Sequence, residues 1–75
     1  MASLPALSGR DVVEAFAQAV WQKVRQRGSH MILVKEGHMA TLSVPDHKEV
    51  AKGTLRSLIR SSGLSVEEFL GFTKK

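Results

Sequence analysis

The chain contains no cysteine, which excludes disulfide bonds and thiolate metal sites. Aromatic residues make up only 5% of its 75 residues. No apolar run approaches the length that a membrane span needs. Residues 1–7 have no positive region and too short an apolar stretch for a signal peptide, so we expect a cytoplasmic protein without a membrane partner. At this length we expect a single domain over residues 1–75.

Common catalytic motifs are also missing. The sequence has no P-loop, no dinucleotide glycine motif and no recognisable Ser/His/Asp set for acyl transfer. It does have an excess of positive charge, with 11 Lys and Arg against 7 Asp and Glu, a formal net charge of +4 and a pI near 10.0. This balance favours an anionic partner, such as nucleic acid or an acidic protein.

Residue spacing predicts a helix followed by three strands. Ser8 and Asp11 predict an N-cap with a capping box, and apolar residues then recur at helical spacing, which predicts a helix over Gly9–Ala19. Segments 21–26, 29–35 and 38–44 are typical of strands. Two-residue turns at Arg27–Gly28 and Glu36–Gly37 are expected to join them as hairpins.

The remaining sequence predicts two more helices. Apolar spacing indicates a helix over Gly53–Ser62, and Gly63 suits the position just after its end. Ser65 and Glu68 predict a capping box that begins a last short helix. We therefore predict an α+β fold of order α-β-β-β-α, in which a three-stranded antiparallel sheet carries its helices on one face.

The predicted turns also assign side chains to the two faces of the sheet. His30 is expected opposite Arg25 on one side and Ser43 on the other, and a bulge at Gly28 would shift this register. The helix-covered face would carry Val24, Met31, Leu33, Ala40, Leu42 and Val44. The open face would carry Trp21, Lys23, Arg25, His30, Ile32, Val34, Met39, Thr41 and Ser43. Trp21 would either stack on a base there or seal the core beneath the first helix.

A histidine among arginines on an open sheet face is suited to RNA cleavage. An imidazole titrates near neutral pH, and neighbouring cations attract phosphate. We expect His30 to act as general acid or base and the arginines to stabilise charge. The RNA-binding residues expected here are Lys23, Arg25, Arg27 and Ser29. The alternative is that His30 only hydrogen-bonds to the turn.

A second basic group lies on the predicted second helix. Lys52, Arg56 and Arg60 recur every four residues and so share one face, and free amides near Gly53–Thr54 could also receive an anion. These three side chains either contact the RNA backbone or form a solvated outer face.

The other two histidines carry less information. His47, in the loop after the third strand, is a candidate for a second acid or base, or else is simply solvated. His38 beside the second turn is expected to be exposed and without a role. The three histidines are scattered over strands and a loop, so we expect no metal site and no cofactor.

The run Val24-Arg25-Gln26-Arg27-Gly28-Ser29-His30, with Gly53-Thr54-Leu55-Arg56-Ser57-Leu58-Ile59-Arg60 and Gly63–Leu70 downstream, resembles the HicA (YcfA-like) mRNA interferase toxins over Ser8 to Leu70. The resemblance implies a fold like a double-stranded-RNA-binding domain. It implies a metal-independent endoribonuclease acting on mRNA, the toxin of a toxin–antitoxin pair, inhibited by a HicB-like antitoxin. The family's essential histidine falls on His30, and members often carry a histidine where His47 stands. Val20 departs from the family, which often has glycine there.

Two other function classes remain open at this stage. One is a non-catalytic RNA-binding module that uses its basic sheet face, and the other is a small domain that binds an acidic protein. Loss of His30 separates them from the ribonuclease, because only cleavage requires the imidazole.

Overall fold

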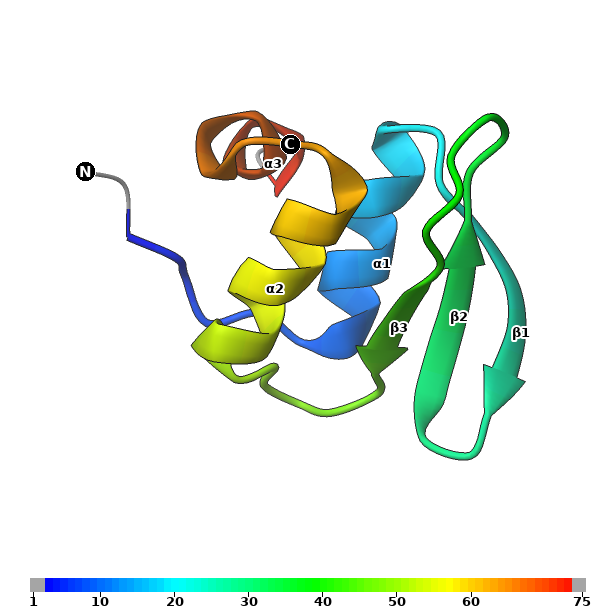
Figure 1. The fold of residues 1–75 in the computed structure, drawn as a ribbon. Coiled ribbons are helices and arrows are strands. Elements are labelled where there is room, and N and C mark those ends of the chain that lie inside the picture. Colours follow the sequence, from blue (N-terminus) through cyan, green and yellow to red (C-terminus); the bar gives the residue numbers. More distant parts are fainter. Residues whose placement is uncertain (1–2, 74–75) are drawn as a thin grey trace.

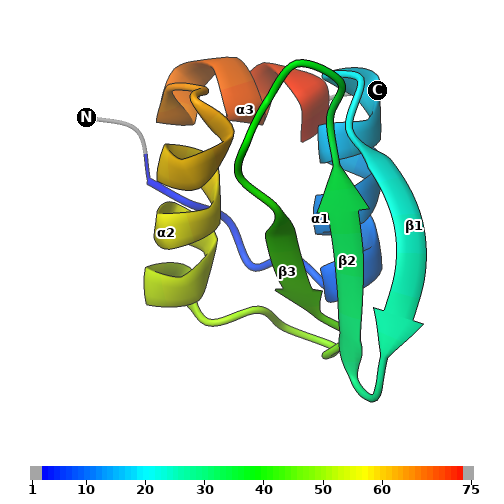
Figure 2. The ribbon, with the colours of Figure 1, turned by 45° about the vertical axis from the view of Figure 1, so that its right-hand side comes forward.

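The computed structural model describes residues 3–73 and gives a three-stranded sheet with helices on one side (Figure 1). The elements in chain order are α1 (Gly9–Gln18), β1 (Gln22–Arg27), β2 (His30–Val34), β3 (Leu42–Pro45), α2 (Lys52–Ser62) and α3 (Val66–Thr73). Both α1 and α2 pack behind the sheet, and α3 packs against them at one end (Figure 2). The predicted α+β order is confirmed. In this part of the chain, no helix combines the length and the apolar character that crossing a membrane requires.

Both predicted capping boxes are present. The Ser8 hydroxyl accepts a hydrogen bond from the Asp11 amide at 3.1 Å, and the Asp11 carboxylate accepts one from the Ser8 amide at 3.4 Å. Ser65 and Glu68 make the same reciprocal pair at the start of α3. At the end of α2, Gly63 adopts a left-handed conformation with φ of +83°. These local signals fix where the helices begin and end.

The end of α1 is a Schellman motif in which valine holds the glycine position. The Val20 amide donates to the Ala17 carbonyl and the Trp21 amide donates to the Phe16 carbonyl. The rings of Trp21 and Phe16 then meet edge-on, 6.3 Å apart, as the hydrophobic contact of the motif. Val20 pays for this geometry with a φ of +63°, a conformation that β-branched residues rarely adopt.

Val20→Gly is therefore expected to raise the free energy of unfolding. Glycine removes the clash of Cβ with the backbone, which stabilises the folded state, but it also gives the unfolded chain more conformational entropy. The first effect is the larger, so we expect a net gain in stability of about 1 kcal/mol. Urea unfolding of the wild type, Val20→Gly and Val20→Ala measures this. The alanine variant retains Cβ and should gain less than glycine; equal stability of all three proteins would show that Val20 is unstrained.

The first hairpin turns one residue later than predicted, and this shifts the pairing of β1 with β2 by two residues. The turn is Gly28–Ser29, and Arg27, not Arg25, pairs with His30. A tight hairpin turn needs a positive φ at its first central residue, which glycine adopts freely and arginine does not. Gly28 takes that position with φ of +58°. The prediction placed arginine there and was wrong for this reason.

The second connection is longer than a two-residue turn. A turn does form at Glu36–Gly37, closed by a 3.0 Å hydrogen bond from the His38 amide to the Lys35 carbonyl. However, β3 begins only at Leu42, four residues later than predicted. The side chain of His38 points toward α2 and not along the sheet, and its Nε2 is 3.0 Å from the Ser61 carbonyl oxygen. His38 is therefore a structural residue and is partly buried, contrary to expectation.

The pairing of β2 with β3 also shifts by two residues, because His30 is opposite Pro45 and not Ser43. A shift of two residues leaves each side chain of β2 and β3 on its predicted face. Met31, Leu33, Leu42 and Val44 lie in the core as predicted. On β1, a bulge between Lys23 and Arg25 breaks the alternation at Val24. The irregularity is therefore at Val24 and not at Gly28. Val24 is 52% exposed, and Ala40 lies in the long connection outside the sheet, so neither belongs to the core as predicted.

Trp21 lies in the core and not on the open face. Its side chain is only 2% exposed, between Phe16 of α1 and the ring of His38. Phe16 also contacts Phe69 of α3, with ring centroids 5.0 Å apart. Stacking of Trp21 on an RNA base is thereby excluded in this structure, and the alternative, in which the indole seals the core beneath α1, is confirmed.

Candidate functional site

The hairpin of β1 and β2 gathers the most basic part of the sequence around His30. His30 is the first residue of the central strand, with Arg27 directly opposite on β1 and Pro45 opposite on β3. Directly opposed residues have Cβ atoms about 4.5–5.5 Å apart. Arg25 is the diagonal neighbour at about 7–8 Å, because it pairs with Ile32. An imidazole and two guanidinium groups thus share one end of the open face, the sheet face that no helix covers.

The open face has an apolar floor beside these charges. Ile32 is on the same face as His30 but is only 8% exposed, between Arg25 on one strand and Ser43 on the other. Long arginine side chains cover such a floor with their methylene groups and keep the charged end in water. His30 itself is exposed, so a bound strand could reach its ring.

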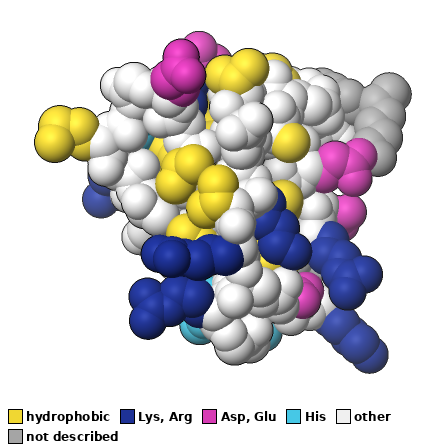
Figure 3. Space-filling view, turned by 90° about the vertical axis from the view of Figure 1, so that its right-hand side faces the viewer, with side chains coloured by type: hydrophobic (Ala, Val, Ile, Leu, Met, Phe, Trp, Pro, Cys, Tyr) yellow, Lys and Arg dark blue, Asp and Glu magenta, His cyan; other side chains and the backbone are white. Residues whose placement is uncertain are grey.

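Figure 3 looks at the molecule from the side on which β1 lies. Lys and Arg side chains gather on the lower half of this view, hydrophobic side chains lie above them, and parts of histidine side chains are visible near the bottom, among the basic ones. All six residues of β1 are exposed. This surface is suited to a phosphate backbone, which binds cations and donors irrespective of base sequence.

Lys23 was predicted to contact RNA from the open face, but the bulge at Val24 places it on the other side of β1. Beyond Val24, Lys23 pairs with Leu33, whose side chain is in the core, so Lys23 belongs to the opposite alternation from Arg25. Its Nζ donates a 3.2 Å hydrogen bond to Oε1 of Gln26. The prediction that Lys23 extends from the open face with Arg25 is therefore wrong.

His47 lies in the loop after β3, on a different part of the surface. It lines a cleft of about 240 Å³ together with Ser8, Arg10, Asp46 and Lys48, and His30 is not among the residues that line it. The cleft is next to the hairpin turn, since the Asp46 amide donates to the Ser29 carbonyl. His47 therefore neighbours the site without folding over it.

Gly9 fixes that loop against α1, a role that sequence reasoning missed. Its amide donates a 2.8 Å hydrogen bond to the His47 carbonyl, and a Cβ at this position would overlap the Pro45 carbonyl oxygen. Both neighbours are backbone atoms, one in Pro45, which pairs with His30, and one in the loop that follows β3. The start of α1 and the end of β3 can approach this closely only because residue 9 is glycine.

Gly9→Ala is expected to lower the free energy of unfolding by about 1–3 kcal/mol, the usual cost of forcing atoms into a packed site. The matched control is Gly53→Ala, because open space surrounds that glycine in α2. Thermal unfolding of both variants tests the difference. If Gly9→Ala unfolds at or above the temperature of Gly53→Ala, the close approach is not a constraint.

The predicted basic stripe of α2 is present but on a separate element. Lys52, Arg56 and Arg60 are all exposed. α2 begins at the same end of the molecule as the β1–β2 turn and runs away from it (Figures 1 and 2). Lys52 is thus the stripe residue at the His30 end, and Arg60 lies about 12 Å further along the helix. Arg56 and Arg60 flank a shallow hollow of about 270 Å³ whose other lining residues are Ile59, Leu64 and Val66.

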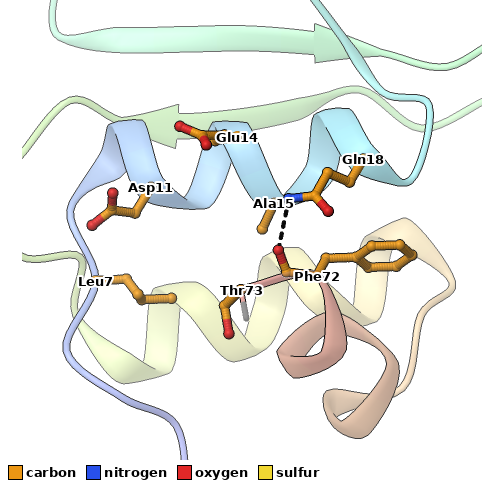
Figure 4. A pocket seen from close by; sticks show the side chains of 7 residues that line it. All are labelled: Leu7, Asp11, Glu14, Ala15, Gln18, Phe72 and Thr73. Carbon is orange, nitrogen blue, oxygen red and sulfur yellow. Dashed lines mark hydrogen bonds between the residues drawn. The ribbon is translucent and has the colours of Figure 1, made fainter. Parts of the chain in front are cut away.

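A further hollow, between α1 and α3, has a different chemistry. Its volume is about 200 Å³, and Gln18 closes one side with a 2.8 Å hydrogen bond from Nε2 to the Phe72 carbonyl (Figure 4). Asp11 and Glu14 line it, and none of the predicted site residues does. Carboxylates repel phosphate, so this hollow is not part of an RNA site. Within residues 3–73 no group of three or more His, Asp or Glu side chains is placed to hold a metal ion.

Comparison with known proteins finds a family that matches most of the chain. A sequence model of the HicA toxin of bacterial toxin–antitoxin systems matches residues 9–64, which include His30, His47 and the α2 stripe. No curated protein and no solved structure gives a match. The matched segment is well over half of the chain and carries every element from α1 to α2. The chain therefore belongs to the HicA family, the toxins of bacterial toxin–antitoxin systems.

Proposed function

We propose that this toxin is a metal-independent endoribonuclease that cleaves mRNA and uses His30 as general acid or base. The observation that carries the proposal is the pairing of His30 with Arg27 at the exposed end of the open face. The first is a group that can transfer a proton near neutral pH, and the second is a fixed positive charge.

The proposed reaction is attack of the RNA 2′-oxygen on the adjacent phosphorus. A base takes the 2′-OH proton as the new O–P bond forms, and an acid gives a proton to the departing 5′-oxygen as the old bond breaks. The His30 ring nitrogen performs one of these transfers, which typically accelerates a reaction by about 10²–10⁴-fold. The guanidinium of Arg27, with Arg25 behind it, stabilises the extra negative charge on the phosphoryl oxygens.

The second proton transfer needs another group. His47 is the candidate on the chain, from the cleft it shares with Arg10 and Lys48. An RNA strand passing from the open face over the hairpin turn would reach this cleft, because the turn and the loop are hydrogen-bonded to each other. His47 is proposed as the second acid or base on this basis alone, and water is the alternative.

RNA binding is proposed to extend beyond the hairpin. Arg25, Arg27 and Ser29 contact phosphates near the cleaved bond, and Lys23 contacts the strand at the edge of β1. Exposed cations on α2 add contacts further along the strand: Lys52, Arg56 and Arg60. Such contacts position the RNA without selecting a base sequence.

A toxin of this family has an antitoxin partner, and we propose that it is a HicB-like protein. Its simplest mode of inhibition is to cover His30 and the arginines of the open face. The positive charge of that face favours acidic residues on the antitoxin at the contact.

Controlled expression tests the proposed function. Wild type and His30→Ala are induced separately, and growth and total mRNA are followed. Growth arrest with mRNA loss in the wild type alone supports the ribonuclease. Arrest by both proteins would remove His30 from the mechanism, and arrest by neither would favour the non-catalytic RNA-binding module.

A further inference from the structure

Hydrogen bonds behind the hairpin turn connect it to the loop after β3. Gln26 is opposite Met31, a core residue, and so it is on the side of the sheet away from His30. Its Nε2 donates to the Gly28 carbonyl at 3.3 Å and to Oδ2 of Asp46 at 3.4 Å. Its Oε1 accepts from Lys23. A reversed amide would set its oxygen against a carbonyl and a carboxylate, so these partners fix the orientation of Gln26.

The backbone of Asp46 also contacts the turn. Its amide donates a 2.6 Å hydrogen bond to the Ser29 carbonyl, the oxygen of the peptide that joins Ser29 to His30. This bond continues the β2–β3 pairing one residue beyond Pro45. Asp46 therefore fixes the turn twice, through its own amide at Ser29 and through Gln26 at Gly28.

The Asp46 carboxylate is partly buried in a cleft whose other lining residues are Ser8, Arg10, His47 and Lys48. Its side chain is 26% exposed, and Oδ1 is 3.7 Å from Nε of Arg10, whose side chain is 84% exposed. A pair so open to solvent contributes little stability. A negative charge beside a surface that binds phosphate weakens binding, so RNA affinity does not account for it. The hydrogen bond to Gln26 gives it a use.

We propose that Asp46 is a positioning residue, which holds the Gly28–Ser29 turn through Gln26 and thereby sets the place of His30. This inference rests on the proposed ribonuclease function. Asp46 acts from behind the sheet, and the His30 ring faces the RNA. Misplacing a catalytic group by 1 Å can cost on the order of 10²-fold in rate, so a loosened turn lowers kcat without weakening substrate binding.

Cleavage kinetics of a defined RNA oligonucleotide test the proposal. Asp46→Ala should lower kcat roughly 10-fold with KM unchanged or reduced. Asp46→Asn should retain most of the wild-type kcat, because its amide oxygen can still accept from Gln26. The control is Glu49→Ala, which removes the same charge from an exposed position in the same loop and should cleave like the wild type. A wild-type kcat for Asp46→Ala, or a raised KM alone, would overturn the proposal.

Gln26→Ala tests the same link from the other side. This residue is exposed, so its truncation leaves the core intact. Because the Asp46 side chain acts through Gln26, the double variant should lose no more kcat than Gln26→Ala alone. Fully additive losses would show that the two residues act independently and would contradict the proposed link.

Backbone NMR relaxation separates failure of this proposal from failure of the ribonuclease function. The order parameters of Ser29 and His30 should fall in Asp46→Ala and stay near the wild-type values in Asp46→Asn and Glu49→Ala. If the wild type cleaves no RNA, the ribonuclease proposal fails, yet this measurement still decides whether Asp46 orders the turn. Unchanged order parameters in Asp46→Ala would overturn the positioning role in either case.

Discussion

His30→Ala is expected to lower the rate of RNA cleavage by at least about 10²-fold, because it removes the group that transfers a proton. The fold should be retained, since His30 is exposed at the end of its strand and contributes nothing to the core. Single-turnover cleavage of an RNA oligonucleotide measures the rate, and urea unfolding checks the fold.

The matched controls are variants of the other two histidines. His47→Ala lowers the rate less than His30→Ala if water can replace it, and equally if His47 is the second acid or base. His38→Ala should affect stability more than cleavage, because its ring packs against Trp21. Cleavage by His30→Ala at the wild-type rate would remove His30 from the mechanism, whatever the other variants do.

Arg27→Ala is expected to have the second largest effect on cleavage. Arg27 faces His30 directly, whereas Arg25 is only the diagonal neighbour. We therefore expect Arg27→Ala to lower the cleavage rate by about 10²-fold, which is a larger loss than that of Arg25→Ala. Lys35→Ala removes the same charge from the segment after the far end of β2 and serves as the control. Arg27→Lys should recover only part of the rate, because an ammonium cannot make the paired contacts of a guanidinium.

Comparing the cleavage rates of Arg25→Ala and Arg27→Ala tests the hairpin register. If Arg25→Ala impairs cleavage more than Arg27→Ala, Arg25 is the residue nearest the reacting phosphate and the account of the site is wrong. Similar losses for Lys35→Ala and Arg27→Ala would indicate a general effect of charge on RNA affinity. Measuring kcat and KM separately distinguishes these cases.

The helices and their ends could be predicted from the sequence because their signals are local. Ser8 with Asp11 and Ser65 with Glu68 specify two helix starts within four residues each. Gly63 ends α2 in the left-handed conformation expected for that position. The faces of β2 and β3 were also predicted correctly, since errors of two residues preserve strand alternation.

Pairing between strands could not be predicted as well, because it depends on the conformation of single residues and on distant contacts. Gly28 determines the turn by taking the first central position, where the prediction had placed Arg27. The bulge at Val24 and the departure of His38 toward α2 leave no periodic signal in the sequence. The bulge places Lys23 on the opposite side of β1 from Arg25, and β3 begins only at Leu42, beyond the segment in which His38 contacts α2.

The roles of Gly9 and Asp46 could not be predicted from the sequence either, because they depend on contacts between distant segments. Gly9 and Asp46 are far apart in sequence, and no local pattern indicates that they lie close together. The structure brings both against the segment beside His30. By contrast, His30 and the two arginines were predicted as a group because they lie within six residues of one another.

The measurement that tests the central claim most directly compares RNA and DNA as substrates for the purified protein. A single-stranded RNA oligonucleotide, the same RNA with one 2′-deoxy nucleotide before the mapped cleavage site, and the matching DNA are each incubated with EDTA present. The account predicts cleavage of the RNA, loss of that cut in the substituted RNA and no cleavage of the DNA, because the 2′-oxygen is the nucleophile. An RNA that stays intact, or a cut that survives removal of the 2′-hydroxyl, would contradict it.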